Sequence, residues 1–562
     1  MPDNDNKDHQ LLKACTEKNV TKLFLENATE KFDDKNKGFF YTEKFEYPLD
    51  EEIREKIKKI NEKVKENSDE FEIFKCQNEI KELWTKLISK AIKCLRFFDE
   101  REPYIIKPDN QETDKKLLFT VNEEKKPSAY GVDALTEYFN KYVDFENLMY
   151  GSSNKYRDHV IHVFRTWLTG VHCLINKDGA YIKKININGK DGGVQLNYCE
   201  KLSIWTLIAL THDLGYPLEI SKKILDKTHS MVSTFITNPD TSINLSFQGA
   251  QNYMNDFVVR LMSSKMEMKK EEKTNAENTE ANKKDDKFIY FARLQPKYYF
   301  KLMKSLERNK HGIISTLIIY KLLIYFLESE YNINEDYSFN LEGRRQFYIR
   351  REILRSIAAH TCKDIYHLSM EAFPFLLIIA DDTQEWGRKH LSDLYFISEN
   401  HYRRTYIDID MQCDGTEKNK CSVKETLISY NSEAIKALIE KLYSQSIDYI
   451  MLFRDGQDTK NRDFQFEKTC KIIYESKTKQ KIEIEFKLVI DNIKKAEFSG
   501  EITYSSDEDI NNIFDKKYFE SIIIKNNKAE LICSEKKKDG SISDSDKPEN
   551  CEKIKIIFSP LS

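Results

Sequence analysis

A histidine–aspartate pair, His212-Asp213, follows an almost continuously apolar stretch, residues 202–210, that is long enough for several turns of a helix. Gly215 and Pro217 come directly after the pair and would end that helix. Placing ionisable side chains at the end of a buried helix is costly unless they meet a charged or hydrogen-bonding partner. A divalent cation is the natural partner of an imidazole beside a carboxylate, so the sequence predicts two metal ligands here.

Further candidate ligands lie on other expected helices. His159 belongs to a helical pattern whose apolar positions indicate packing against a core, and His162 shares its face at i, i+3. Either imidazole could be the ligand; His159 is the preferred one, with His162 supporting it. A second apolar stretch, residues 372–380, runs directly into Asp381-Asp382. Asp381 is the expected ligand, and the alternative is that both carboxylates are solvated residues at a helix end.

The order of these residues along the chain resembles that of the HD superfamily of metal-dependent phosphohydrolases. The resemblance covers about residues 150–388, and the residues that flank the histidine–aspartate pair, Thr211 and Leu214-Gly215, follow the family's style. Family members with two metals have additional histidines between the pair and the last aspartate, where this chain has His311 and His360. Each of these two, taken alone, could instead be a core or surface histidine. The resemblance implies the following metal ligands: His159, His212, Asp213, His311, His360 and Asp381.

A ligand set of imidazoles and carboxylates without thiolates suits manganese, magnesium, iron, cobalt or zinc, with one or two ions in the site. Such an ion lowers the pKa of a bound water molecule and polarises a phosphoryl oxygen. We therefore expect an enzyme that hydrolyses phosphate ester or anhydride bonds. Asp213, His311 and His360 are the expected catalytic residues.

Phosphate oxygens require positive charge nearby, and arginine matches their geometry. Five arginines lead into the segment that contains His360, and the last of them, Arg355, is the candidate for substrate binding from that run. A solvated helix face is the alternative reading of the run. Arg157 and Arg388 stand next to the predicted ligands in sequence and are the other two candidates.

The expected substrate is a nucleotide, and the preferred class is a deoxynucleoside triphosphate. Residues 247–252 loosely resemble a segment of the deoxynucleotide triphosphohydrolases, and a role in nucleotide depletion or antiviral defence would follow. The chain departs from those enzymes at Tyr216-Pro217, where they usually have another histidine. One alternative is a phosphodiesterase for cyclic or oligonucleotide messengers. The other is a non-enzymatic HD scaffold that senses a nucleotide.

The chain of 562 residues is long enough for more than one hydrophobic core. We expect a mainly α protein: an N-terminal helical region (1–135), an HD-type helical domain (136–402) containing an unstructured insertion (263–287), and a C-terminal α/β domain (403–562). In that last region residues 481–486 and 553–556 alternate between polar and apolar, as strands do, while residues 432–443 have a helical pattern. The C-terminal domain is predicted to regulate the protein or to mediate a homo-oligomer or a contact with a protein partner.

Charge and apolar content exclude several classes of function. The 89 basic and 93 acidic side chains nearly cancel, so the net charge of −4 gives no argument for nucleic acid or an anionic membrane. The eleven cysteines include no close pair of the kind that a thiolate zinc site needs. The strongest apolar run, residues 313–327, is interrupted by Lys321 and is too short to span a bilayer. The sequence predicts a soluble, cytoplasmic protein with reduced cysteines.

Overall fold

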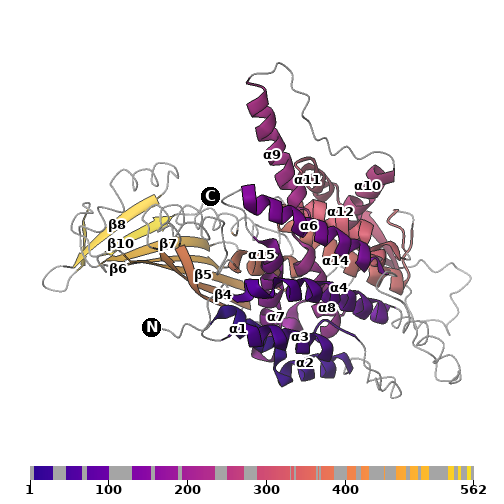
Figure 1. The fold of residues 1–562 in the computed structure, drawn as a ribbon, viewed down its shortest axis with the longest axis horizontal. Coiled ribbons are helices and arrows are strands. Elements are labelled where there is room, and N and C mark those ends of the chain that lie inside the picture. Colours follow the sequence, from indigo (N-terminus) through magenta and orange to yellow (C-terminus); the bar gives the residue numbers. More distant parts are fainter. Residues whose placement is uncertain are drawn as a thin grey trace, which may run out of the picture.

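The computed structural model shows a mostly helical protein with a β-sheet formed by its C-terminal part (Figure 1). This confirms the expectation of a mainly α fold. The structure describes residues 6–29, 46–65, 72–99, 130–152, 158–187, 193–234, 250–270, 288–329, 331–334, 337–362, 365, 369–384, 402–412, 419–429, 449, 464–475, 481–491, 495–504, 529–536, 542–545 and 553–558.

The N-terminal region packs directly against the central helices. It consists of α1 (Lys7–Thr16), α2 (Lys18–Thr29), α3 (Glu51–Lys63), the short 3-10 helix η2 (Glu72–Cys76) and α4 (Gln77–Asp99). The Asp50 side chain caps α3 by accepting a hydrogen bond from the Ile53 amide, which satisfies one of the free amides at that helix start. A fully buried ion pair joins Asp8 of α1 to Arg165 of the following central helix, with 2.6 Å between Oδ2 and Nη2. The predicted N-terminal helices therefore share the core of the helices that follow.

The central part of the chain forms the helices that carry the predicted site. They are α6 (Val132–Ser152), α7 (His159–Lys184), α8 (Tyr198–Thr211), α9 (Tyr216–Val232), α10 (Ala250–Ser263), α11 (Pro296–Glu307), α12 (His311–Leu322), α13 (Ile324–Leu327), α14 (Leu341–Ala359) and α15 (Phe373–Thr383). Helix α9 projects away from the body of the molecule (Figure 1).

Helix α8 is the centre of this arrangement, because every one of its residues is buried. Asn197 and Glu200 form a reciprocal capping box at its start, so that two amides of the helix end are hydrogen-bonded inside the protein. Helix α7 approaches it closely at Gly170, where a Cβ atom would lie 2.0 Å from the ring of Trp205. Only glycine permits this contact between the two helices. Helices α4, α7 and α14 surround α8, so the apolar stretch before His212 is the core of the helical part.

A two-stranded antiparallel ribbon follows α10, formed by β1 (Ser264–Lys270) and β2 (Phe288–Leu294). Residues 263–287 were predicted to be an unstructured insertion, and for residues 264–270 that prediction is wrong. The alternate side chains of Ser264 and Met266 are buried, which gives this polar segment one face on the core. Residues 271–287 lie outside the described residues.

The C-terminal part forms an eight-stranded sheet with the order β3-β4-β5-β6-β7-β10-β8-β9. Strands β4 and β5 pair in parallel and the other neighbours are antiparallel. Its strands are β3 (Tyr402–Gln412), β4 (Asn419–Ser429), β5 (Phe464–Glu475), β6 (Lys481–Asp491), β7 (Lys495–Tyr504), β8 (Ala529–Lys536), β9 (Ile542–Ser545) and β10 (Lys553–Phe558).

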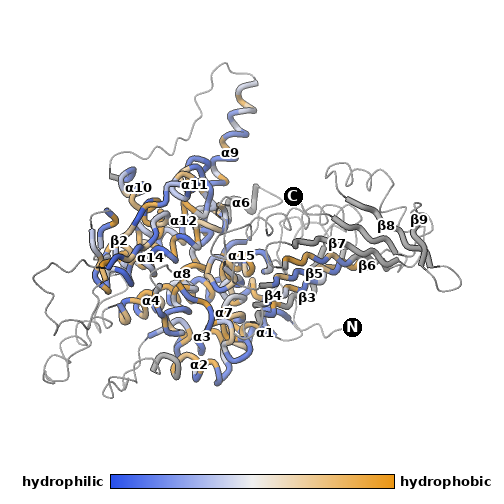
Figure 2. Tube along the Cα trace, turned by 180° about the vertical axis from the view of Figure 1, so that it is seen from behind, coloured by the Kyte–Doolittle hydropathy of each residue, from blue (hydrophilic) through white to orange (hydrophobic). Residues whose placement is uncertain are grey.

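The strands that the alternating patterns predicted, β6 and β10, are both present. Figure 2 shows the alternation of hydropathy along the strands nearest the helices. The predicted helix at residues 432–443 lies outside the described residues, so the structure describes the C-terminal part as a sheet. This sheet contacts the helical part at its β3–β5 side. There the rings of Phe375 and Phe466 lie 6.2 Å apart, and Lys177 of α7 pairs with Asp410 of β3.

The described cysteines and helices bear on the predictions of reduced thiols and of no membrane span. No disulfide joins the eight cysteines in the part of the chain that the structure describes, and all eight are buried. Among the described helices, none combines the length and the apolar character needed to cross a bilayer.

Candidate metal centre

The histidine–aspartate pair lies where α8 meets the start of α12. His212 ends α8, and Gly215 donates its backbone N–H to Ser315 Oγ at 2.8 Å. A Cβ atom at position 215 would lie 2.4 Å from the carbonyl oxygen of His311, so the glycine allows α12 to approach this closely. The Ser315 hydroxyl lies 2.7 Å from the carbonyl oxygen of His212 and closes the junction. This contact brings His311, the first residue of α12, next to the pair.

Each carboxylate oxygen atom of Asp213 lies close to the Nε2 atoms of two imidazoles. Its Oδ2 atom lies 3.1 Å from Nε2 of His162 and 3.4 Å from Nε2 of His212. Its Oδ1 atom lies 3.3 Å from Nε2 of His311 and 3.6 Å from Nε2 of His360. Four helices, α7, α8, α12 and α14, therefore deliver an imidazole to one buried carboxylate.

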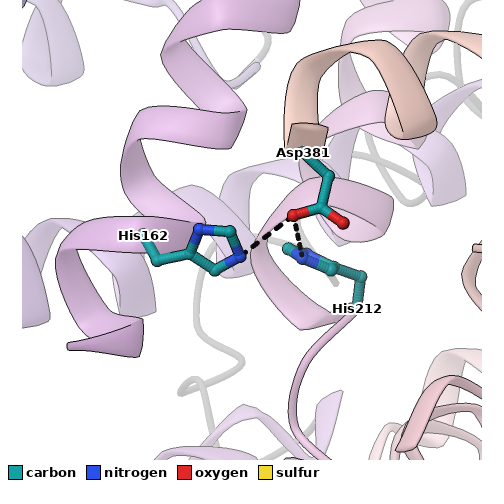
Figure 3. Close-up of side chains that lie close together, drawn as sticks. All are labelled: His162, His212 and Asp381. Atoms are coloured by element: carbon teal, nitrogen blue, oxygen red, sulfur yellow. Dashed lines mark ion pairs between the residues drawn. The ribbon is translucent and has the colours of Figure 1, made fainter. Parts of the chain in front are cut away.

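Asp381 completes the cluster from the last turn of α15. Its Oδ1 atom lies 3.1 Å from Nε2 of His162 and 3.7 Å from Nε2 of His212, and Figure 3 shows the three side chains converging. The ligand atoms form two groups in which all lie within 4.8 Å of one another, His162 with His212 and Asp381, and His212 with Asp213 and His360. His212 belongs to both groups. The cluster thus has the residues to hold a metal ion.

Each of the four imidazoles is fixed through its other nitrogen, Nδ1. His212 and His360 direct Nδ1 to the carbonyl oxygens of Ala209 and Ile357 one turn earlier in the chain, the first at 2.9 Å. His311 directs Nδ1 to Glu219 Oε2 at 2.7 Å. Holding Nδ1 in this way sets the tautomer and points Nε2 at the cluster, as the outer partners of metal-bound histidines do.

His162 is held by Gln384, whose side-chain nitrogen contacts Nδ1. The two ends of an amide group exchange places when it turns by 180°, and the oxygen then accepts a hydrogen bond from Nδ1–H. Gln384 lies one turn after Asp381, at the end of α15. One helix end therefore supplies a ligand candidate and the partner that orients another.

The two carboxylates are held in their deprotonated, negatively charged form, which is the form that binds a cation. Burial alone would raise the pKa of Asp213, but the charge of His212 and the other imidazoles close to the carboxylate hold it well below its usual range. Burial is likewise outweighed at Asp381, where the neighbouring imidazoles of His162 and His212 hold the pKa well below the usual range. Both side chains are therefore ionised at neutral pH, the state in which they bind metals.

Burial and the charges of the carboxylates also shift the pKa values of the imidazoles. Burial opposes protonation of His311, yet its hydrogen bonds with Asp213 and Glu219 raise its pKa to about 9. Burial also opposes protonation of His212, but Asp213 and Asp381 raise its pKa. At His360 burial prevails and lowers the pKa. The negative field of the cluster therefore favours a positive charge among the imidazoles, which a bound cation would supply.

Two buried nitrogen atoms support this fit. Nε2 of His212 and Nε2 of His360 have no hydrogen-bond partner among the described residues, although both are shielded from solvent. Burying a polar nitrogen without a partner is costly. A divalent ion coordinated between these nitrogens and the carboxylates would remove that cost, and imidazole with carboxylate is a donor set that such ions accept.

Against the preference for His159, the structure places His162 and not His159 beside the carboxylates of Asp213 and Asp381. His159 turns to Glu146 of α6, which lies 2.7 Å from Nδ1 and also accepts the backbone N–H of His159 at 2.8 Å. Its ring lies 4.2 Å from that of Tyr216. Residues three apart share a helix face but differ by about 60° around the axis, so only one of the two imidazoles meets the carboxylates.

The predicted arginines lie in different places. Arg157 and Arg388 are outside the described residues. Arg355 lies over the ring of Tyr298, 5.0 Å from its centre. In the same run, Arg345 and Arg350 are buried and paired with acidic side chains of the core. These two arginines are therefore neither on a solvated helix face nor available to bind a phosphate.

Sequence reasoning missed the side chains that orient the imidazoles, Glu219, Gln384 and Glu146. The spacing of Gln384 one turn after Asp381 is a signal that could have indicated it. Glu219 and Glu146 carry no such signal, because each meets its histidine only through the packing of separate helices.

Five of the six predicted ligands lie together in the cluster, and His162 takes the place given to His159. They are His212, Asp213, His311, His360 and Asp381. Compared with protein-family models, with curated proteins and with solved structures, the chain matches none.

Proposed function

We propose that this protein is an HD-type metal-dependent phosphohydrolase that acts on a nucleotide. The substrate class that we propose is a deoxynucleoside triphosphate. The observation that carries the proposal is the Asp213 carboxylate with two imidazoles on each oxygen atom. A carboxylate in that position can bridge two ions. The order of the ligands along the chain, which resembles that of the HD superfamily, supports the same assignment.

One ion would be held by His162, His212 and Asp381 with Oδ2 of Asp213. A second would be held by His311 and His360 with Oδ1 of Asp213. When bound, manganese, magnesium, iron, cobalt or zinc supplies an activated water molecule and neutralises charge on the phosphoryl oxygens.

The protein's own groups would handle binding and protons. Ionised Asp213 and Asp381 orient the site by accepting hydrogen bonds from water. His311 is the most exposed of the imidazoles, and its partner Glu219 holds the ring with Nε2 toward Asp213. With one ion bound, His311 could hold a proton at Nε2 for the oxygen that leaves phosphorus, as general acids do. With two ions bound, the same nitrogen is a ligand.

The substrate is assigned from the sequence resemblance and from the chemistry of the site. Of the resembling segment, residues 247–249 lie outside the described residues and residues 250–252 begin α10. Arg157, Arg355 and Arg388 remain the candidates for phosphate binding. Nucleotide depletion in the cytoplasm, including antiviral defence, is the role that we infer for such an activity, with the C-terminal sheet as a regulatory or interaction module.

A panel of substrates tests the proposal. The purified protein is incubated with Mn²⁺ and deoxynucleoside triphosphates, ribonucleoside triphosphates, cyclic nucleotides and short oligonucleotides, alongside Asp213→Ala and a control, Asp226→Ala, at an exposed position of α9. We expect the wild type and the control to release phosphate or triphosphate, and Asp213→Ala to lose more than about 100-fold. Equal release by all three proteins would overturn the proposal.

A phosphodiesterase is the second candidate. Tyr216 stands where triphosphohydrolases usually have a histidine, and its ring lies between His159 and His311, 4.2 Å and 5.6 Å away. Cleavage of cyclic nucleotides or oligonucleotides without turnover of triphosphates would select it. If neither class is hydrolysed but a nucleotide binds, the non-enzymatic scaffold is the remaining candidate.

A further inference from the structure

The last turn of α15 carries two adjacent carboxylates that face different parts of the molecule. Asp381 meets His162 and His212 in the metal centre. Asp382 accepts a hydrogen bond from the hydroxyl of Tyr449, with 2.7 Å between the oxygen atoms. Successive residues of a helix point about 100° apart, which explains the two directions. The side chain of Tyr449, which comes between β4 and β5 in the sequence, thus reaches the residue next to a predicted metal ligand.

Tyr449 is itself held by strand β5. It is buried, and its ring is stacked on that of Phe466, 4.9 Å away at 28°. Two residues along the same strand, the ammonium group of Lys468 lies 5.6 Å from the centre of the ring. A face-on cation and a stacked aromatic ring restrict the orientation of the tyrosine.

The support behind Tyr449 is a buried ion pair. Lys468 Nζ lies 2.9 Å from Oε1 of Glu425 on the neighbouring strand β4, and both side chains are shielded from solvent. Phe466 also contacts Phe375, near the start of α15, with 6.2 Å between the ring centres. Strand β5 therefore meets α15 at both ends, through Phe375 at the start and through Tyr449 at the last turn.

We propose that Tyr449 is a positioning residue through which the C-terminal sheet holds the last turn of α15 and thereby keeps Asp381 within reach of His162 and His212. The sheet then belongs to the working metal centre although it contributes no ligand. The effect on hydrolysis rests on the proposed function, whereas the effects on the helix and on metal affinity do not require a substrate.

The experiment compares full-length variants by three measurements: hydrogen exchange of the α15 amides without metal, affinity for Mn²⁺, and kcat and KM. Tyr449→Phe removes only the hydroxyl. Asp382→Ala removes the acceptor, and Asp382→Asn retains an oxygen that can accept. The matched control is Tyr299→Phe, which loses a tyrosine–aspartate hydrogen bond to Asp256 of α10 at 2.6 Å.

We expect Tyr449→Phe to speed exchange in the last turn of α15 and to weaken Mn²⁺ binding about tenfold, which corresponds to the loss of one hydrogen bond to a charged group. If the enzyme is active, kcat falls while KM stays. Asp382→Asn retains most of the wild-type values, and adding Tyr449→Phe to Asp382→Ala has no further effect. Tyr299→Phe matches the wild type in all three measurements.

The proposal is overturned if Tyr449→Phe and Asp382→Ala match Tyr299→Phe in α15 exchange and in Mn²⁺ affinity. If Tyr449→Phe does not fold, Asp382→Ala removes the same bond and gives the same readout. Wild-type protein that binds Mn²⁺ but hydrolyses no nucleotide contradicts the proposed function alone. If the wild type binds no Mn²⁺, the metal centre is refuted, and the exchange rates still decide whether Tyr449 holds the helix end.

Discussion

Two clusters of charged side chains are buried in the helical part, and they differ in the cations that face their carboxylates. In the first, Asp99 at the end of α4 lies 3.4 Å from Arg350 and 3.5 Å from Arg345, both of α14. Arg345 also pairs with Glu200 of α8. In the second, the candidate metal centre, the carboxylates of Asp213 and Asp381 face imidazoles.

The difference explains why one cluster is structural and the other is suited to an ion. A guanidinium group stays protonated in proteins, so the arginines bring permanent charge to their carboxylates. An imidazole, unlike a guanidinium group, can release its proton and then bind a metal ion. The carboxylates of the candidate metal centre therefore face groups whose positive charge a metal ion can replace, and two imidazole nitrogens beside them have no hydrogen-bond partner among the described residues. The acid beside the arginines belongs to the core, whereas the acids beside the histidines form a cluster that could hold a metal ion.

The largest effect is expected at His212, because its buried Nε2 lies near both carboxylates, 3.4 Å from Asp213 and 3.7 Å from Asp381. His212→Gln preserves side-chain volume and removes this nitrogen. We expect Mn²⁺ affinity to fall by more than the roughly 100-fold that losing an outer partner of a ligand typically costs. Calorimetric titration with Mn²⁺ and elemental analysis measure it. A variant that retains the wild-type metal content would show that the cluster is not the metal site.

The arginine cluster should respond in stability and not in metal binding. Asp99→Asn leaves Arg345 and Arg350 without their shared carboxylate, and breaking a buried pair from one side costs about 3–5 kcal/mol. Urea unfolding measures the loss, with Asp226→Asn on the exposed face of α9 as the control. Mn²⁺ affinity of the folded variant stays at the wild-type value. A stability change no larger than that of the control would contradict the structural role.

The comparison becomes sharper at the two histidines of α7. We expect His162→Gln to weaken Mn²⁺ binding about 100-fold and His159→Gln to weaken it less than about tenfold, because His159 is bonded to Glu146 instead of facing Asp381. Parallel titrations of the two variants give the ratio. The opposite order would restore His159 as the ligand.

The smallest expected effect is on the pH dependence of the stability of the metal-free protein. Folding raises the pKa of His311 from 6.5 to about 9, so the protonated imidazole favours the folded state. This contribution is fully present below pH 6.5 and is lost as the pH rises through about 9. Urea midpoints of chelator-treated wild type and His311→Gln should therefore converge between those values. A difference that grows with pH would reverse the sign and contradict the assignment.

The sequence predicted much of the helical part because local rules were sufficient there. An apolar helix ending in His212-Asp213, and another ending in Asp381, place polar residues at predictable points of a buried element. Alternation predicted β6 and β10 for the same reason, since side chains of a strand point to opposite faces. The short strand β1 was missed because most of its residues are polar and its pairing partner β2 follows only after residues 271–287.

The sequence by itself determined the types of the candidate ligand residues, their order and the helices that carry them. Only the tertiary structure decided which imidazole of α7 meets the carboxylates, because Glu146 of another helix binds His159 and leaves the cluster to His162. The same holds for Asp99 and Arg350, which lie 251 residues apart in sequence, and for Tyr449 and Asp382. Periodicity fixes the face on which a side chain lies, but the partner of a buried charge depends on how separate elements pack.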